Sequence, residues 1–211
     1  MRLAHDPTAV RRLRPPTGEA PWRVLLSGCM AGLACGVDGT DYGFGGRMQW
    51  FFDLPGVVAV PFCPEEAGLG VPRGWPDIEG GDGFDVLDGK AAVVDEKVND
   101  LTAGMIEGAE AMVAFARAER VDFAILLDMS AACGTQVISD GTRFKEDRAY
   151  RRGLGVAAAA LVRAGVPVVS HRDDRTLDRL RLRIETDGAP RKDVEDHHER
   201  AWYREYFGSS A

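Results

Sequence analysis

Residues 24–29 read VLLSGC, an apolar run that breaks at a glycine and ends in a cysteine. Residues 57–63 read VVAVPFC, and residues 123–127 read FAILL, with Cys133 following after a short polar turn. Short continuous apolar runs are typical of buried strands in a parallel sheet. The carboxyl ends of such strands lie along one edge of the sheet, where α/β folds bind ligands. We therefore expect the three cysteines to converge at that edge.

Helical patterns separate the apolar runs. Asp100 precedes a predicted helix that runs to about residue 118, in which apolar residues recur near helical spacing. An alanine-rich stretch predicts a second helix over 153–164. A fourth strand is predicted at 166–169, which reads VPVV. Strands that alternate with helices predict an α/β fold: a Rossmann-like, doubly wound and mainly parallel sheet flanked by helices.

The remaining segments of the domain predict shorter elements. Residues 45–53 predict a short helix, and residues 63–83, rich in glycine and proline, predict a long ordered loop. An Asp-Gly pair between apolar flanks predicts a hairpin over 86–94 with a tight turn. A second short hairpin is predicted over 136–144.

Composition divides the chain into three parts: a lead-in at 1–22, the α/β domain at 23–171 and a C-terminal helical extension at 172–211. The extension is strongly charged at first, and it then predicts an amphipathic helix over 192–207 that ends in aromatic residues. We expect this arm to pack on the domain or to form a homodimer with a second subunit. His197 and His198 are adjacent and do not share a helical face as a metal-binding pair would, so we expect them on the surface.

Composition and charge also restrict the class of protein. The 211 residues suit one domain with an ample core, and the net charge of −7 argues against a partner with a phosphate backbone. No nucleic acid polymer is therefore expected, although a small base or nucleoside is compatible with this charge. The basic N-terminus lacks the apolar region of a secretory signal, and no apolar run is long enough for a membrane span. We expect a cytoplasmic protein without membrane contact, whose cysteines are reduced.

The four cysteines are the strongest candidates for chemistry. Thiolates bind zinc, copper(I) and iron–sulfur clusters because soft sulfur donors match soft metals. Structural zinc sites usually contain closely spaced pairs, whereas Cys29 and Cys35 are six residues apart and Cys63 and Cys133 stand alone. This spacing fits a cluster assembled from separate loops better than a zinc finger. Spacing alone favours a simpler interpretation, in which the cysteines are small buried apolar residues.

Several polar residues near the cysteines have two interpretations each. Glu65 follows Cys63 closely enough to act as a general acid or base at a bound metal, or it is a solvated loop residue. Ser130 either hydrogen-bonds a substrate or stabilises a turn. Arg73 either orients a planar or anionic ligand or is solvated. Asp38 precedes Gly39, and an Asp-Gly pair indicates a turn before any other role.

Taken together, three motifs resemble the 2-thiouracil desulfurase (TudS-like) family. They are SGCMAGLACGVDG at 27–39, CPEEAGLGVPR at 63–73 and SAACG at 130–134. Shorter matches are GGDGFDV at 80–86, DLTAGMIEGA at 100–109 and GVAA at 155–158. The resemblance spans about residues 23–171, and its ordered set of motifs outweighs the interpretation of the cysteines as simple buried residues.

The resemblance implies an enzyme and assigns roles to several residues. It implies a 4Fe–4S cluster held by Cys29, Cys63 and Cys133, with the fourth iron open to the sulfur of a thiolated pyrimidine. It also implies catalytic roles for Glu65 and Ser130. The expected reaction is the non-redox desulfuration of a small thiouracil- or thiouridine-type substrate, which converts C=S to C=O and releases sulfide.

The same motifs contain further candidate residues. Asp38 and Arg73 lie within them, and we expect both to bind substrate. Many relatives lack a cysteine at position 35, so we expect Cys35 to be dispensable.

The chain departs from the family pattern at three places. Ala131 and Ala132 replace a Pro-Ser pair, residues 127–129 replace a common lysine or arginine, and residues 36–37 replace Arg-Tyr. These changes predict a reshaped pocket and a substrate other than 2-thiouracil. The change at Ala131 and Ala132 also motivates an alternative function, a cluster- or thiol-based ligand-binding protein or sensor without turnover. A third alternative is a structural protein whose aromatic tail mediates assembly.

Overall fold

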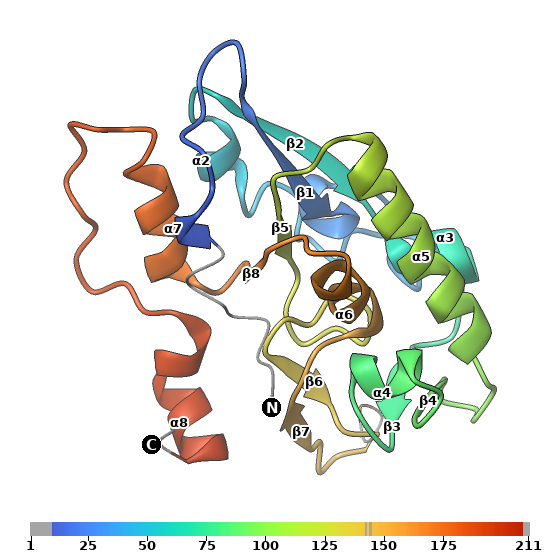
Figure 1. Ribbon diagram of the computed structural model, residues 1–211. Helices are drawn as coiled ribbons and strands as arrows, with labels where there is room; N and C mark the ends of the chain where they lie inside the picture. The colour runs from blue at the N-terminus through green and yellow to red at the C-terminus, as the bar shows by residue number, and fades with distance from the viewer. Residues whose placement is uncertain (1–9, 142, 144, 209–211) are drawn as a thin grey trace.

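The computed structural model describes residues 10–141, 143 and 145–208. Its central sheet contains four parallel strands in the order β2-β1-β5-β8 (Figure 1). These strands are β1 Trp22–Ser27, β2 Val57–Phe62, β5 Phe123–Leu126 and β8 Val168–Ser170. The predicted parallel α/β sheet is confirmed. Its winding reverses direction between β1 and β5, and the carboxyl ends of strands at such a point form the usual ligand crevice.

Each face of the sheet packs against a separate set of helices. Leu25 and Leu126 belong to the core beneath α5 and α6, whereas Val24 and Ile125 belong to the core on the opposite face, because successive strand side chains alternate. Helix α5 spans Thr102–Ala118 and α6 spans Val156–Arg163, close to the helices predicted from the sequence. The opposite core includes residues from α2, Gln49–Phe52, and α7, Asp174–Arg181.

Two predictions for the segment between β2 and α5 are wrong. The glycine- and proline-rich stretch at 63–83 contains α3, Pro64–Leu69, and β3, Asp77–Glu79, instead of one long loop. The predicted hairpin over 86–94 is replaced by α4, Gly83–Leu87, and β4, Ala92–Val94, which pairs with β3 in antiparallel orientation. Asp82 forms a capping box that starts α4, so the Asp-Gly pair follows a helix and does not join two strands.

The second predicted hairpin is also wrong in its extent. Strand β6, Val137–Ser139, pairs with β7, Tyr150–Arg152, which lies beyond the predicted segment 136–144. Residues 142 and 144 of that segment lie outside the described residues, as do 1–9 of the predicted lead-in and 209–211 of the extension.

Helices α3 and α5 approach each other closely because glycines line their contact. A Cβ atom added to Gly68 would lie 1.8 Å from the carbonyl oxygen of Gly104, and one added to Gly108 would lie 2.0 Å from that of Pro64. Neither position accepts even a methyl group without a shift of the backbone. This contact fixes the position of α3, the helix that begins directly after Cys63.

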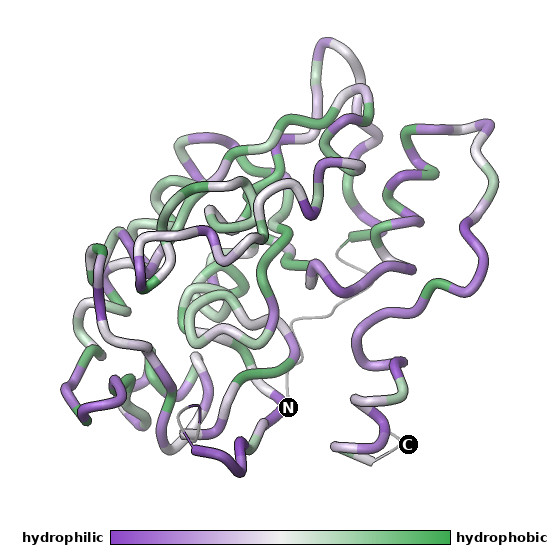
Figure 2. Tube along the Cα trace, turned by 180° about the vertical axis from the view of Figure 1, so that it is seen from behind, coloured by the Kyte–Doolittle hydropathy of each residue, from purple (hydrophilic) through white to green (hydrophobic). Residues whose placement is uncertain are grey.

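The C-terminal extension contains α7, the short 3-10 turn η2, His197–Glu199, and α8, Ala201–Phe207. The single helix predicted over 192–207 is therefore two short elements. Figure 2 shows that the trace of this part is mostly hydrophilic, in contrast to the core strands. Leu177 and Leu180 of α7 nevertheless enter the core of the domain. His197 is only 1% exposed, so the prediction that it lies on the surface is wrong.

No helix within the described ranges is both long and apolar enough to cross a lipid bilayer.

Candidate metal and catalytic site

The carboxyl ends of β1, β2 and β5 bring the cysteines together. Cys29 lies in η1, the 3-10 turn Gly28–Ala31 that follows β1, and Cys63 is the N-cap of α3 after β2. Cys133 lies in the loop that follows β5. All three line one small cavity of about 40 Å³, and Cys35 lines it as well. The cavity is therefore built from residues that are far apart in the sequence.

Cys35, which the sequence analysis set aside, is a fourth thiol at this cavity. Hydrogen bonding to Cys29, together with burial, raises the pKa of Cys35 to about 12. Hydrogen bonding to Cys35 and burial raise the pKa of Cys63, and burial raises that of Cys133. All four cysteines are free thiols. The three with raised pKa values keep their protons at neutral pH until a metal displaces them.

The donor set fits a multinuclear cluster better than a single metal ion. A tetrahedral zinc ion with Zn–S bonds of about 2.3 Å holds its thiolates about 3.8 Å apart. Among the described residues, no three cysteine sulfurs lie within 4.8 Å of one another. Several soft sulfur donors at this wider spacing suit an iron–sulfur cluster.

The carboxylate of Glu65, in the first turn of α3, is held from two sides. Arg73 donates from Nη2 to Oε2 at 2.8 Å, and the Ser130 hydroxyl donates to Oε1 at 3.2 Å. The side chains of Arg73 and Glu65 are only 4% and 16% exposed, so solvent ions screen this ion pair weakly. Glu65 also lines the cysteine cavity. The alternative of a solvated loop glutamate is therefore wrong.

Ser130 joins this carboxylate to the turn that carries Cys133. Its hydroxyl oxygen accepts the backbone N–H groups of Ala132 at 3.2 Å and Cys133 at 3.1 Å. The turn-stabilising contact predicted for Ser130 is thus present. The same hydroxyl lines the cavity beside Glu65, which leaves its predicted substrate contact open.

Of the two residues expected to bind substrate, Arg73 lies at the cysteine cavity and Asp38 lies outside it. Arg73 lines the cysteine cavity, but its guanidinium also donates to the carbonyl oxygens of Gly70 and Cys35, each at 2.9 Å. It is therefore placed to position Glu65. Asp38 is exposed, and its Oδ1 accepts both the N–H and the hydroxyl of Thr40. It lines neither the cysteine cavity nor the cleft beside it, and its contacts are those of a turn.

A cleft of about 350 Å³ adjoins the cysteine cavity and shares four lining residues with it, Tyr42, Glu65, Leu127 and Ser130. Two aromatic side chains of the cleft, Tyr42 and Trp75, stack with ring centroids 5.7 Å apart and planes 29° apart. The sequence analysis missed both. Each lies in a glycine-rich segment without the apolar periodicity of a core element. An aromatic residue in such a segment is the sequence signal that could have identified them.

Basic side chains line another part of the cleft, and the sequence analysis missed these too. They are Arg143, His171 and Arg172. Burial lowers the pKa of His171 to about 4, although the carboxylate of Asp128 opposes this shift, so the imidazole is neutral at pH 7. The Nε atom of Arg172 is buried and has no hydrogen-bond partner among the described residues. Arg172 therefore brings one unpaired donor to the lining of the cleft.

The departures from the family pattern fall into two groups in space. Ala131 and Ala132 are 1% and 0% exposed, belong to the hydrophobic core and line neither cavity. Their carbonyl oxygens accept N–H groups from the start of α6. Residues 127–129, by contrast, all line the cleft. Val37 also lines the cleft and Gly36 lines the cysteine cavity, so the changes at 36–37 and at 127–129 both reach the space where a ligand would lie.

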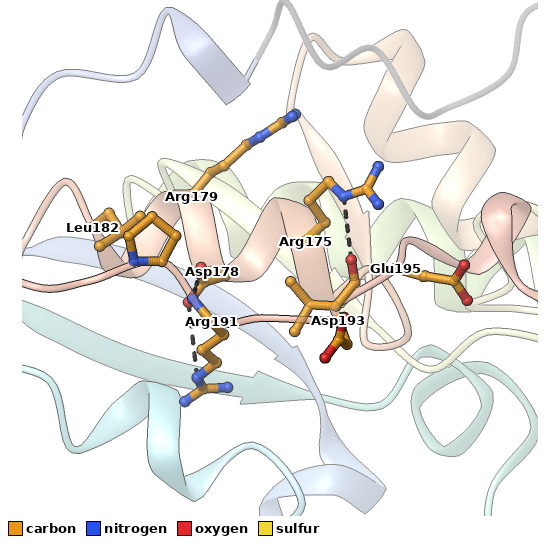
Figure 3. Close-up of a pocket in the computed structure, with 9 residues that line it drawn as sticks. Arg175, Asp178, Arg179, Leu182, Arg191, Asp193 and Glu195 are labelled. Atoms are coloured by element: carbon orange, nitrogen blue, oxygen red, sulfur yellow. Dashed lines mark hydrogen bonds and ion pairs between the residues drawn. The ribbon is translucent and has the colours of Figure 1, made fainter.

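A larger cavity of about 780 Å³ lies in the extension, between α7 and residues 190–195 (Figure 3). Three of its charged side chains bond to one another or to the backbone: Asp178 pairs with Arg191, and Arg175 Nε donates to the carbonyl oxygen of Val194 at 3.2 Å. It contains no cysteine and none of the candidate catalytic residues. Size alone therefore does not identify the site.

Comparisons with known proteins agree on one family. Residues 24–173 match the family described as 2-thiouracil desulfurase. The chain is 34% identical over 151 residues to YbbK, an uncharacterized protein of Bacillus subtilis (strain 168), with 71% of this chain and 96% of YbbK covered. It is also similar to the solved structure of the 4Fe-4S-dependent thiouracil desulfidase TudS, with a TM-score of 0.57 and 30% identity over 71% of this chain and 90% of that chain.

Proposed function

This chain belongs to the 2-thiouracil desulfurase family and is an enzyme, and on that basis we propose that it removes sulfur from a small thiolated pyrimidine of the thiouracil or thiouridine type. One observation carries the proposal. The cavity lined by four thiols shares Glu65 and Ser130 with a cleft that has stacked aromatic rings. A metal site, a proton-transfer group and a surface for a flat ring thus adjoin one another.

We assign the cofactor, a 4Fe–4S cluster, to Cys29, Cys63 and Cys133. The soft donors and their spacing support this assignment, as does the similarity to TudS, which depends on such a cluster. When held by three protein thiolates, the cluster supplies an iron that acts as a Lewis acid toward the thiocarbonyl sulfur. Cys35 is not needed as a ligand in this assignment.

The reaction we propose is a hydrolysis. Water forms a bond from its oxygen to the ring carbon, the carbon–sulfur bond breaks, and the sulfur leaves with two protons as hydrogen sulfide. The carbon keeps its oxidation state because sulfur is exchanged for oxygen, so the reaction needs no electron donor or acceptor.

Glu65 is the residue we assign to proton transfer in this hydrolysis. Its Oε1 atom faces Ser130 and its Oε2 atom is held by Arg73, so the carboxylate has one fixed orientation at the cavity. In that position it removes a proton from the attacking water and returns it to the leaving sulfur. Ser130 orients Oε1 and keeps the turn that carries Cys133 in place.

The cleft supports a flat aromatic ligand. Stacking of a base on aromatic side chains contributes about 1–3 kcal/mol per base. Trp75 is 40% exposed and lines the cleft, where it stacks on Tyr42 and presents ring surface for such a contact. Because residues 127–129 differ from the family pattern and line the same cleft, we propose that the substrate differs from 2-thiouracil in its substituents.

The alternative of a sensor without turnover has lost its motivation. It rested on the changed residues Ala131 and Ala132, which pack in the core and do not line the cleft. Glu65, the residue that turnover requires, is held in place by two partners. An enzyme is therefore the better account of the site.

The proposal is tested by anaerobic reconstitution with iron and sulfide, followed by assays with thiouracils, thiouridines and thioamides. We expect one molecule of sulfide per oxo-product for at least one thiolated pyrimidine. The variant Asp38→Ala, which changes an exposed side chain outside both cavities, should retain the wild-type rate. A cluster-loaded protein that releases sulfide from none of these compounds contradicts the proposal.

A further inference from the structure

A buried contact joins the C-terminal extension to the loop that carries Ser130 and Cys133. His197 Nδ1 lies 2.5 Å from Oδ2 of Asp128, and the two side chains are 1% and 0% exposed. The residues are 69 positions apart, and His197 lies beyond residue 173, where the match to the family ends. The contact is therefore an addition of this chain to the family's domain.

Asp128 is the residue that closes this loop. Its Oδ1 atom accepts backbone N–H groups from four loop residues, at 2.9–3.3 Å: Met129, Thr135, Gln136 and Val137. These donors lie on both sides of Ser130 and Cys133 in the sequence. The position of one carboxylate therefore determines the path of the chain through both residues.

The charge of Asp128 needs partners because the side chain is fully buried. Burial opposes ionisation, but the contact with His197 and the backbone N–H groups outweigh it and hold the pKa of Asp128 well below its usual range. At Oδ2 the partners are His197 and the hydroxyl of Ser170, at 3.1 Å. Loss of the histidine removes one of the two groups that fix this oxygen.

His197 is itself held firmly in the extension. Its backbone N–H donates to Asp173 Oδ1 at 3.0 Å, and its ring stacks on Trp202 with centroids 5.8 Å apart and planes 12° apart. The turn η2 that carries it begins with a capping box formed by Asp196 and Glu199. These contacts present one nitrogen of the imidazole to Asp128 in a fixed direction.

We propose that His197 is a positioning residue of the active site, which acts through Asp128 to hold the loop 128–137 so that Ser130 reaches Glu65 and Cys133 reaches the thiol cavity. The C-terminal extension then helps to set the geometry of the active site and is not an appended arm. The effect on turnover rests on the proposed desulfurase function, whereas the effect on the loop does not. Displacement of a catalytic group by about 1 Å can lower a rate by about 100-fold.

Two substitutions separate the hydrogen bond from the packing of the ring. His197→Phe keeps an aromatic ring of similar shape and removes the donor to Asp128. His197→Asn places an amide nitrogen near the position of Nδ1 and keeps the donor, while it loses most of the stacking. Arg204→Ala is the control within the extension, because it removes only an exposed ion pair to Glu195.

Hydrogen exchange of the full-length chain is the first measurement, since it requires neither cluster nor substrate. We expect His197→Phe to speed exchange of the amides of Thr135, Gln136 and Val137 by about tenfold or more, with wild-type rates in His197→Asn and Arg204→Ala. In the loaded enzyme we expect kcat of His197→Phe to fall by about 10- to 100-fold with KM within about threefold. His197→Asn should restore most of kcat.

The outcomes are decisive in both directions. Unchanged loop exchange in a folded His197→Phe protein overturns the proposal, and so does a His197→Asn protein as defective as His197→Phe. If His197→Phe fails to fold, His197→Asn alone decides, because the proposal requires near-wild-type exchange and kcat from it. If the wild-type protein releases no sulfide, the proposed function fails, and the exchange measurement still judges the role of His197.

Discussion

The hydroxyl of Ser130 lies 3.2 Å from Oε1 of Glu65, although 65 residues separate the two in the sequence. One residue follows β5 and the other lies in α3, which follows β2. Their contact joins the two sides of the thiol cavity, because the same hydroxyl oxygen accepts the N–H of Cys133. The carboxylate proposed for proton transfer and the turn that carries Cys133 therefore meet at one hydroxyl group.

Glu65→Ala should abolish sulfide release and leave the iron content unchanged. General acid–base catalysis contributes about 10²- to 10⁴-fold, so we expect kcat to fall by at least about 100-fold. Sulfide release and iron per chain are the measurements. Glu66→Ala is a matched control, since Glu66 is the exposed neighbour on the same helix. Equal losses in both variants would contradict the role of Glu65.

Cys29→Ser, Cys63→Ser and Cys133→Ser should each lose most of the reconstituted iron, and Cys35→Ser should retain about four irons per chain. Iron content and the broad absorbance near roughly 400 nm after anaerobic reconstitution are the measurements. Cys35 is an exacting control because it lines the same cavity. Loss of iron in Cys35→Ser with retention in any of the other three would reassign the ligands.

Trp75→Ala should raise KM about tenfold and change kcat little. The expectation follows from the loss of about 1–3 kcal/mol of stacking with a flat ring, a contact present in the ground state and the transition state alike. Steady-state kinetics with the best substrate measure both constants. A fall in kcat at constant KM would place Trp75 in the chemical step instead.

Stability should decrease between pH 6.5 and pH 4 because of His171. The unfolded histidine binds a proton near pH 6.5, whereas burial lowers the pKa of the folded residue to about 4. The stabilisation is therefore full above pH 6.5 and is lost as the pH falls toward 4. From pH 7 to pH 5 we expect a loss of about 2 kcal/mol in the free energy of unfolding.

Denaturant titrations of wild type and His171→Asn at the two pH values test this loss. Asparagine keeps an acceptor for the N–H of Asp128, which His171 Nδ1 accepts at 3.1 Å, but it does not titrate. The variant should therefore show a pH dependence smaller by about 2 kcal/mol. Identical curves for the two proteins would remove His171 as the cause.

Assembly through the C-terminal arm remains a prediction. Trp202 and Tyr206 of α8 are 37% and 43% exposed and lie on the surface of this single chain. Light scattering should give the mass of a dimer, and the double substitution Trp202→Ser/Tyr206→Ser should shift it to that of a monomer. A monomeric wild-type protein at all concentrations measured would end this prediction.

The sequence predicted the sheet well because its evidence there is local. Apolar runs at 24–27, 57–62 and 123–126 have few other uses, and each coincides with a strand. The prediction of a loop at 63–83 failed because glycine content was given more weight than local helix signals. Pro64 at the first position and two glutamates in the first turn are typical of a helix start.

The candidate site was predictable where its residues lie in motifs and not where they meet only in space. Cys29, Cys63, Cys133, Glu65 and Ser130 all line the predicted cavity. His197 had no local signal, because its partner Asp128 is distant in the sequence and its burial depends on how the extension folds back. Asp38 lies inside a motif but lines neither cavity, and its contacts with Thr40 fit the turn that the Asp-Gly pair indicated.

The glycine contact between α3 and α5 has a consequence for how this enzyme can diversify. Gly68 and Gly108 have no room for a methyl group, so the position of α3, the helix that carries Glu65, is fixed against α5. Substitutions at this contact therefore cannot shift the helix by small steps to suit a new substrate. Trp75, Arg143 and Arg172 line the cleft from segments outside this contact between α3 and α5. New specificities in descendants of this chain should therefore arise by exchange of those three side chains, with the thiol side of the molecule inherited unaltered.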